Sequence, residues 1–304
     1  MKQKTRFLLI LFILAPLAGG CFLKSMAVDT IADSLAGTGD TFSSDNDPQL
    51  VGDAVPFSLK LMESVLSATP RHTALLTALA KSFTEYAYAY VQTNAETIAD
   101  EDYKKSKEQK LRAKKLYIRA RDYGLRGLEN RFKGITQTIR SDPKGAVVKA
   151  KKEDAELMYW TGVSWMAAIS IGKADPELVS DVPQAEALIY KAFELDPNYD
   201  KGTMYDFLIT YEGGKPALMG GSAKKAKELF DAAMKVNNGQ SASTYVNYAE
   251  AVCEKEQNRE QFEELLHKAL EIDADKETST RLVNLLTQKR ARWLLTREDE
   301  LFVK

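Results

Sequence analysis

A repeated spacing of small and large residues constrains the fold of this chain more than any other feature. In four segments, a small or apolar residue is followed four positions later by a large one and three positions after that by alanine. Steps of four and three place the three side chains on one face of an α-helix. Small residues on that face let a second helix approach closely, so each segment is expected to belong to a helix pair. The segments are Ala113-Tyr117-Ala120, Ala185-Ile189-Ala192, Ala226-Phe230-Ala233 and Phe262-Leu266-Ala269.

These segments recur at irregular distances. From 113 to 185, 185 to 226 and 226 to 262 the separations are 72, 41 and 36 residues, compared with about 34 in a regular tetratricopeptide repeat. Insertions at 141–154 and 173–184 explain the longer intervals, and partner helices are predicted in LMYWTGVSWMAA (157–168) and STYVNYAEAVCE (243–254). No stretch shows the alternation typical of β-strands. The predicted fold is therefore all-α, with degenerate tetratricopeptide-like repeats packed into one compact superhelical domain.

The N-terminus has the organisation of a secretory signal that ends in a lipidation site. Three basic residues precede an apolar run, 7–15, that is too short to span a bilayer. Three small residues, 18–20, then lead directly to Cys21, as in the processing site of bacterial lipoproteins. The alternative is an ordinary signal peptide followed by an incidental cysteine.

This interpretation divides the chain into a signal peptide (1–20), a lipidated Cys21 with its tether (21–46) and a helical domain (47–304). Once Cys21 is acylated, Cys253 is the only remaining thiol, so no intrachain disulfide is expected. The expected location is the periplasm, on a lipid anchor in either the inner or the outer membrane.

Residues 104–133 are strongly basic. They hold twelve Lys and Arg residues against three acidic ones, a local net charge of +9 in a chain whose formal net charge is −1. Such a segment first suggests a nucleic-acid interface, but a lipid-anchored protein outside the cytoplasm meets little DNA, and no nucleic-acid partner is expected. Two roles stay open for Arg119, Arg121 and Arg126: ion pairs within the helical stack, or contact with an anionic ligand or an acidic partner surface.

The sequence carries no pattern typical of an enzyme. Its two histidines, His72 and His267, lie far apart, and it has no zinc-ligand spacing, glycine-rich phosphate loop or nucleophile elbow. We therefore expect no catalytic residue, no metal and no cofactor.

Aromatic side chains are the candidates for a binding surface. Helical spacing by itself predicts buried aromatics, so a place in the core is one interpretation of each of them. The stretch YWTGVSW nevertheless crowds three large rings around a glycine, which favours the hypothesis that at least one of them lines an apolar cavity. The candidates for the cavity are Tyr86, Tyr90, Tyr159, Trp160 and Trp165.

Several long segments resemble the TatT family, lipoproteins associated with tripartite ATP-independent periplasmic (TRAP) transporters. The resemblance is carried by RAKKLYIRARDYGLRGLE, LMYWTGVSWMAAISIGKADPELVSDVP, FEELLHKALEID and RLVNLLTQKRARWLLTREDELF, and also by DPQLVGDAVPFSLKLMESVL and EYAYAYV. It implies a protein of cryptic tetratricopeptide repeats, a homotrimer, with a cavity or pore through each protomer. It further implies docking of the transporter's periplasmic solute-binding protein and passage of a small hydrophobic or carboxylate ligand between the two.

The repeats depart from the tetratricopeptide consensus. No tryptophan opens the later first helices, and Pro197 is the only proline at its repeat position, so the superhelix is not expected to be regular. The expected function is that of a lipid-anchored accessory component of a TRAP uptake system. The alternative is a tetratricopeptide lipoprotein that acts as a protein–protein scaffold in envelope assembly.

Overall fold

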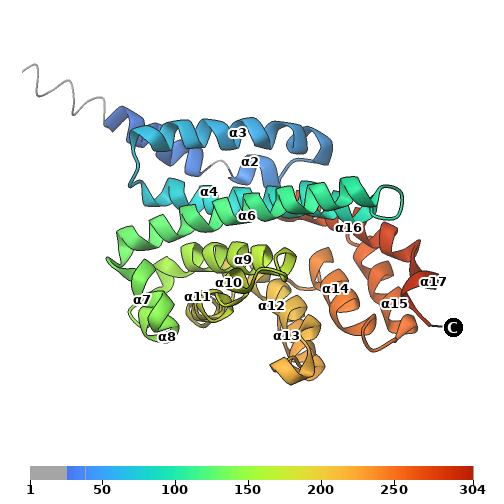
Figure 1. The fold of residues 1–304 in the computed structure, drawn as a ribbon. Helices are drawn as coiled ribbons and strands as arrows, with labels where there is room; N and C mark the ends of the chain where they lie inside the picture. Colours follow the sequence, from blue (N-terminus) through green and yellow to red (C-terminus); the bar gives the residue numbers. More distant parts are fainter. Residues whose placement is uncertain (1–25, 38, 304) are drawn as a thin grey trace, which may run out of the picture.

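The computed structural model describes residues 26–37 and 39–303, and in this part of the chain it contains helices but no β-strand. The all-α prediction is confirmed. The predicted signal peptide (1–20) and Cys21 lie outside the described residues. Figure 1 shows the helices stacked on one another from the N-terminal side (blue) to the C-terminal side (red).

After a helix at residues 26–36, the α-helices are α2 (Gly39–Ser43), α3 (Pro48–Ala68), α4 (Thr73–Tyr86), α5 (Thr93–Thr97), α6 (Tyr103–Arg131), α7 (Ile135–Ser141), α8 (Pro143–Ala146), α9 (Ala155–Ile171), α10 (Pro176–Val179), α11 (Val182–Leu195), α12 (Thr203–Gly214), α13 (Ala223–Val236), α14 (Ala242–Tyr248), α15 (Arg259–Leu270), α16 (Arg281–Leu295) and α17 (Glu298–Leu301). Two π-helices, η1 (Ala87–Gln92) and η5 (Ala249–Cys253), and four 3₁₀ turns, η2 (Lys152–Asp154), η3 (Tyr199–Gly202), η4 (Ala217–Met219) and η6 (Thr278–Thr280), join them.

The N-terminal layer consists of α3 packed on α4. Asp47 begins α3, because its carboxylate accepts hydrogen bonds from the backbone N–H groups of Gln49 and Leu50, each at 3.0 Å. His72 begins α4 in the same way, through a 3.2 Å bond from the backbone N–H of Leu75. Helix packing extends to the N-terminal side of residue 47, since Ala32 is fully buried in the same apolar cluster as residues of α3.

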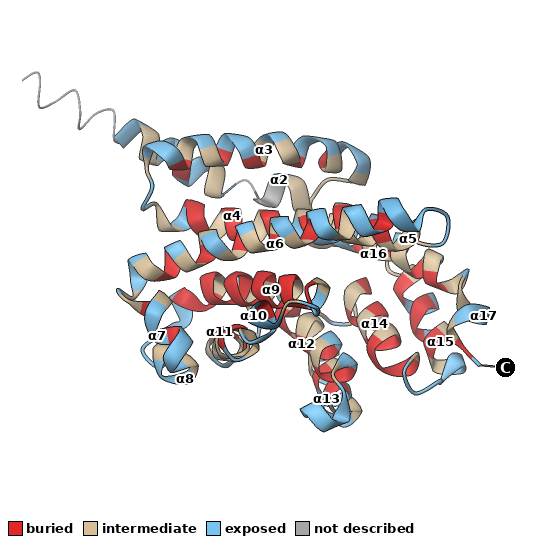
Figure 2. Cartoon of the chain, viewed as in Figure 1, coloured by how far each residue is buried: buried red, intermediate tan, exposed pale blue. Residues whose placement is uncertain are grey.

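The central layer is formed by α6, α9 and α11, which pack side by side in that order. Ala113, Tyr117 and Ala120 of α6 are at most 1% exposed, as the repeat pattern predicts. Figure 2 shows α9 buried along nearly its whole length. Gly162 permits the close approach of α11, because a Cβ at this position would lie 2.6 Å from Cγ1 of Ile189 and 3.0 Å from a backbone carbonyl oxygen.

The later repeats form the pairs that the sequence predicts. α12 packs against α13, and α14 with η5 packs against α15. The glycine-rich stretch 213–222 is the turn within the first of these pairs. Both predicted insertions hold short elements: 141–154 contains α8 and η2, and 173–184 contains α10.

The C-terminal helix α16 turns back and packs against α2 and α3. The guanidinium of Arg281 donates to the backbone carbonyl of Ser44 at 2.8 Å, and Arg290 forms an ion pair with Glu96 of α5 at 2.9 Å. The stack is thereby closed on itself, and space is left between its first and last helices. None of the helices in the described ranges is both long enough and apolar enough to cross a bilayer.

Candidate functional site

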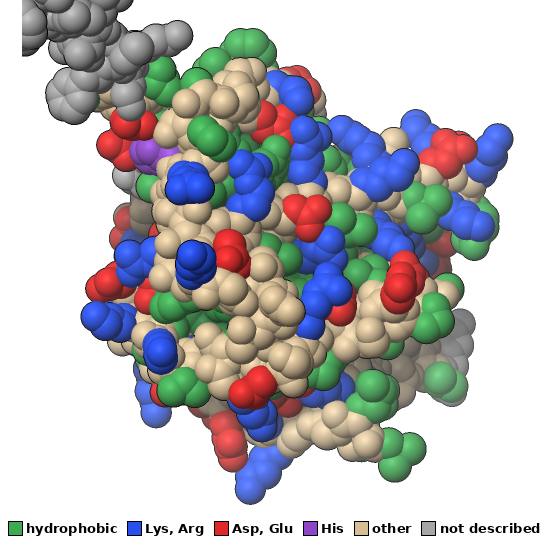
Figure 3. Space-filling view, turned by 60° about the vertical axis from the view of Figure 1, so that its left-hand side comes forward, with side chains coloured by type: hydrophobic (Ala, Val, Ile, Leu, Met, Phe, Trp, Pro, Cys, Tyr) green, Lys and Arg blue, Asp and Glu red, His purple; other side chains and the backbone are tan. Residues whose placement is uncertain are grey.

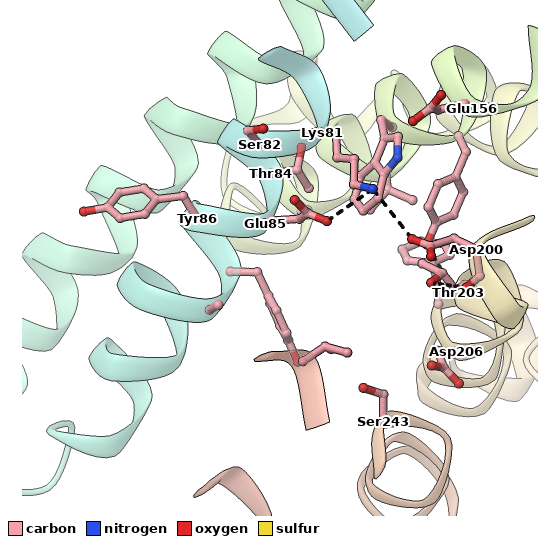
Figure 4. Close-up of a pocket in the computed structure, with 18 of the residues that line it drawn as sticks. Lys81, Ser82, Thr84, Glu85, Tyr86, Glu156, Asp200, Thr203, Asp206 and Ser243 are labelled. Carbon is pink, nitrogen blue, oxygen red and sulfur yellow. Dashed lines mark hydrogen bonds and ion pairs between the residues drawn. The ribbon is translucent and has the colours of Figure 1, made fainter. Parts of the chain in front are cut away.

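The closed stack surrounds a cavity of about 2000 Å³. α3, α4 and η1 border it on one side and α9 and α12 on another, while the start of α14 and part of α16 complete the wall. Figure 4 shows side chains from α4, α9, η3, α12 and α14 around a common open space. The volume exceeds the roughly 300–1,000 Å³ of ordinary small-molecule sites.

Aromatic rings form a continuous wall along α9 and α12. The Tyr159 ring meets the Trp160 ring edge-on at 5.0 Å between centroids and the Phe207 ring at 6.4 Å. Phe207 stacks in turn on Tyr211 at 5.8 Å. The Tyr159 hydroxyl donates to the backbone carbonyl of Thr203 at 3.2 Å, which fixes the ring against α12.

Four of the five aromatic residues singled out in the sequence line the cavity, namely Tyr86, Tyr90, Tyr159 and Trp160. The Tyr86 and Tyr90 rings are stacked at 5.7 Å, and the Tyr90 hydroxyl donates to the backbone carbonyl of Pro48 at 3.0 Å. Trp165 is not among the lining residues. Its ring is 2% exposed and its indole N–H donates to Asp181 at 3.1 Å, so it belongs to the core beside α11.

A charged cluster lies against the Trp160 end of the aromatic wall. The ammonium of Lys81 lies 3.6 Å from a carboxylate oxygen of Asp200, 4.0 Å from one of Glu85 and 5.6 Å from the centroid of the Trp160 ring (Figure 4). Asp200 has a φ of +44°, a left-handed conformation that is uncommon for a residue other than glycine. A strained turn therefore holds its carboxylate beside the lysine.

Glu85 differs from an ordinary surface carboxylate. Burial within the fold raises its pKa to about 7, although Lys81 acts to lower it; Asp200 and Glu156 make smaller upward contributions. Yet 49% of its side chain is accessible. The two observations are compatible because the accessible surface faces the cavity, where the surrounding protein still withholds most of the bulk solvent.

Asp206 of α12 also lines the cavity. Burial raises its pKa to about 7, although hydrogen bonds from the hydroxyls of Thr244, at 2.6 Å, and Ser241, at 3.4 Å, act in the opposite direction. Two carboxyl groups of one cavity thus change charge near neutral pH.

A second polar group joins α5, α16 and the π-helix η5. Arg290 bridges Glu96, at 2.9 Å, and Glu250 of η5, at 2.6 Å, and burial raises the pKa of Glu250. Burial raises the pKa of Tyr88 of η1 as well, with Glu250 the next largest influence. π-Helices are rare and are frequently found at functional sites, and η1 contributes Tyr88, Tyr90 and Gln92 to the lining of the cavity.

The sequence patterns did not predict the charged residues of the cavity. Lys81, Glu85, Tyr88 and Gln92 follow one another at steps of four, three and four, and all line the cavity. A polar stripe at helical spacing, on a helix whose other face is apolar, was the signal that could have found them. The approach of Asp200 and Asp206 depends on the tertiary arrangement, and no local pattern indicates it.

The three candidate arginines lie on α6 and are not cavity residues. Arg119 forms an ion pair with Glu63 of α3, and Arg121 forms one with the neighbouring Asp122 at 2.8 Å while its guanidinium lies 5.3 Å from the Trp165 ring. Arg126 donates to the backbone carbonyl of Pro70 at 3.1 Å. Figure 3 likewise shows basic side chains distributed among acidic and apolar ones over one face of the molecule.

Within residues 26–37 and 39–303, no group of three or more His, Cys, Asp and Glu side chains is arranged to hold a metal ion. The arrangement that the structure does offer is an apolar, aromatic cavity with a few charged groups placed in it, which suits binding.

Comparison with known proteins gives two findings. The family described as TRAP transporter T-component matches residues 44–302 of this chain. A protein of Treponema pallidum (strain Nichols), described as uncharacterized, is 29% identical over 305 residues, which cover 94% of this chain and 94% of the relative.

Proposed function

The chain belongs to the TRAP transporter T-component family, and we propose that it serves its transporter by docking the periplasmic solute-binding protein and taking up that protein's ligand in the central cavity. An accessory role in a TRAP system follows from family membership. Docking and ligand transfer are the new parts of the proposal.

The cavity is the single observation that carries this proposal. It lies almost entirely within the span that defines the family and is bordered by helices from both ends of that span. An accessory protein that acted only as a protein–protein scaffold would not need an open interior of about 2000 Å³, since protein interiors otherwise pack to the density of organic crystals.

The N-terminal half of α6 is the surface proposed for docking. Among the described residues, five lysines of this half form no ion pair, in contrast to Arg119 and Arg121 further along the helix. Unpaired charge at a surface steers an oppositely charged partner and makes association depend on salt. The lysines are Lys104, Lys105, Lys107, Lys110 and Lys115.

Two further features complete the proposal. A lipid on Cys21 would hold the protein at a membrane, so that receptor and transporter meet at one surface. The homotrimer implied by the family resemblance would present three cavities together.

The test is sedimentation of the mature chain, residues 21–304, with and without the periplasmic solute-binding protein of its TRAP transporter. We expect a complex whose affinity falls as salt rises, and an oligomer in the absence of the partner. A triple charge reversal, Lys107→Glu, Lys110→Glu and Lys115→Glu, should weaken the complex by at least about tenfold.

The matched control is charge reversal at exposed Lys224 and Lys235 of α13, which should leave the complex intact. Absence of any complex at low salt, or equal weakening by both sets of variants, would contradict docking through α6.

A further inference from the structure

The outer face of α3 carries large apolar side chains that the fold leaves exposed. We infer that this face lies on the surface of a zwitterionic phospholipid bilayer, as a second membrane contact beside the lipid on Cys21. The inference rests on the proposed function for that lipid alone, and it depends neither on docking nor on the cavity.

Three large apolar side chains lie along one line of α3. Leu50, Phe57 and Leu61 are 57%, 75% and 41% exposed. Their steps of seven and four keep them within about 40° of one another around the helix axis, at 100° per residue. Ala54 is exposed on the same line, so the apolar stripe runs over about three turns of the helix.

The helix has a second apolar face, which is buried against the rest of the protein. A helix at the surface of a globular protein normally has a single apolar face, and a helix that is apolar on further sides is normally covered there as well. The outer stripe of α3 therefore calls for a covering surface of its own. The residues of the buried face are Val51, Val55, Leu59, Met62 and Leu66.

Helix α13 provides a comparison within the same molecule. All of its exposed side chains are charged, namely those of Lys224, Lys225, Lys227, Glu228, Asp231 and Lys235. Single exposed apolar residues are normal at a protein surface, but a contiguous apolar patch marks a contact. Of the fourteen large hydrophobic side chains that are exposed in the described residues, five lie between 26 and 61, because Met26 and Ile31 of the preceding helix join the three of α3.

The stripe lies at the outer edge of the stack. Figure 1 shows α3 along the upper edge of the molecule, and Figure 3 shows apolar side chains at that edge. The described chain begins beside the C-terminal end of α3. There the hydroxyl of Thr69 donates to the carboxylate of Asp29 at 2.9 Å, and the His72 ring lies 3.1 Å from Asp33.

The position of Cys21 brings a bilayer to this edge. Met26 is five positions from Cys21, a distance that the chain spans with about 17 Å at most. Phe57 lies twelve residues, or about 18 Å, along α3 from its Thr69 end. A bilayer that holds a lipid on Cys21 is therefore close to the stripe. Even a weak apolar contact is then sufficient, because the tether makes it intramolecular and gives it a high effective concentration.

The charges of α3 favour a lipid surface without net charge. The charged residues of this helix are Asp53, Lys60 and Glu63. Glu63 pairs with Lys60 at 2.6 Å and also with Arg119 of α6. Two acidic groups and two basic groups thus balance beside the stripe, so burial of apolar surface, and not attraction to anionic lipid, has to supply the contact.

The experiment anchors the mature chain to phosphatidylcholine vesicles through Cys21, with a phospholipid that carries a maleimide on its headgroup. The other thiol, Cys253, is 0% exposed, so coupling takes place at Cys21. Phe57→Trp then places an indole on the stripe, and lipid brominated on its acyl chains quenches an indole that enters the bilayer. We expect brominated lipid to lower the added emission by at least about twofold, since an apolar helix face enters the interface by roughly 5–10 Å.

Lys224→Trp, on the charged face of α13, is the matched control and should show no quenching. Vesicle flotation verifies that each protein is anchored, and the anchored wild-type protein gives the background from its own tryptophans. Anchored Phe57→Trp protein without quenching overturns the inference. Quenching that disappears at high salt also overturns it, because the lysines of α6 would then make the contact.

A second copy of this chain is the other surface that could cover the stripe. In that case Phe57→Glu would dissociate an oligomer of the unanchored chain in sedimentation, and anchored Phe57→Trp protein would not be quenched. Failure of the lipid anchor itself gives a different result. Mass spectrometry of the native protein would find Cys21 without lipid, which overturns the anchor of the proposed function, whereas coupling through maleimide still tests the stripe.

Discussion

Helix α9 borders two regions of opposite character. Toward α11 it forms a closed seam, in which Gly162 lies against Ile189 with no room for a methyl group. Toward α4 and α12 it faces the cavity with Tyr159 and Trp160. The comparison shows that the size of the residues at each helix contact decides whether the stack is solid or hollow, since small residues let helix axes approach and rings hold them apart.

The two regions also differ in how their polar groups find partners. In the packed part of α9, the hydroxyl of Thr161, which lies against Gly124 of α6, donates to the backbone carbonyl of Leu157 at 2.6 Å, and that of Ser164 donates to the carbonyl of Thr161 at 2.9 Å. These groups are satisfied within one helix. On the cavity side the carboxylates of Asp200 and Glu85 pair instead with the ammonium of Lys81, at 3.6 and 4.0 Å, so polar groups there interact between side chains rather than within the backbone of one helix.

The largest effect is expected from filling the closed seam. Gly162→Ala should lower the free energy of unfolding by about 1–3 kcal/mol, because the new methyl group meets a backbone carbonyl that cannot move aside. Urea unfolding measures the change. Gly214→Ala is the control: no atom lies within 4 Å of a Cβ there, so it should not destabilise the protein. Equal losses of stability in both variants would mean that the contact between α9 and α11 is packed no more tightly than the cavity wall at Gly214.

A second effect concerns pH. The pKa values of Glu85 and Asp206 are raised to about 7 from reference values of 4.5 and 3.8, so the folded protein binds more protons than the unfolded chain between these limits. The stability contributed by the protonated forms is present at low pH and is lost as the pH rises toward 7.

The double variant Glu85→Gln, Asp206→Asn should therefore lose less stability than the wild-type protein between about pH 5 and pH 8. Urea unfolding at both pH values compares the two proteins. Parallel curves would mean that these acids titrate as they do in the unfolded chain.

The smallest change in stability is expected inside the cavity. Ser82 of α4 lines the open space, so Ser82→Phe should alter the free energy of unfolding by no more than about 0.5 kcal/mol while weakening the binding of a neutral apolar probe, 3-phenylpropanol, in the cavity. Ala80, two residues earlier, is fully buried, and Ala80→Phe should cost about 1–3 kcal/mol. If Ser82→Phe were the more harmful of the two, the space beside Ser82 would not be open in solution.

Local patterns were sufficient to predict much of this fold. Ala113, Tyr117 and Ala120, or Phe262, Leu266 and Ala269, lie within one helix, so their spacing reports directly on a buried face. The helix cap at Asp47 and the turn at 213–222 also depend only on residues that are close together in the sequence.

The cavity residues come together through contacts between distant parts of the chain, and local sequence patterns do not contain this information. Asp200 and Glu85 meet only because η3 is brought against α4, 115 positions away in the sequence. The closure of the stack by α16 depends on residues as distant as Arg281 and Ser44. Trp165 has the same helical setting as Trp160 in the sequence, and only the position of Asp181 assigns it to the core.

The π-helix η1 has a consequence for how such cavities diversify. Its wider turn accommodates one residue more than an α-helix would over the same length. Deleting a single amino acid between 87 and 92 would therefore restore ordinary α-helical winding within this turn and leave the directions of the later side chains of the rod unchanged. A one-codon change would thus exchange the lining that η1 contributes while Leu75, Leu79 and Phe83 keep their packing, so selectivity can evolve by single insertions and deletions on an unchanged framework.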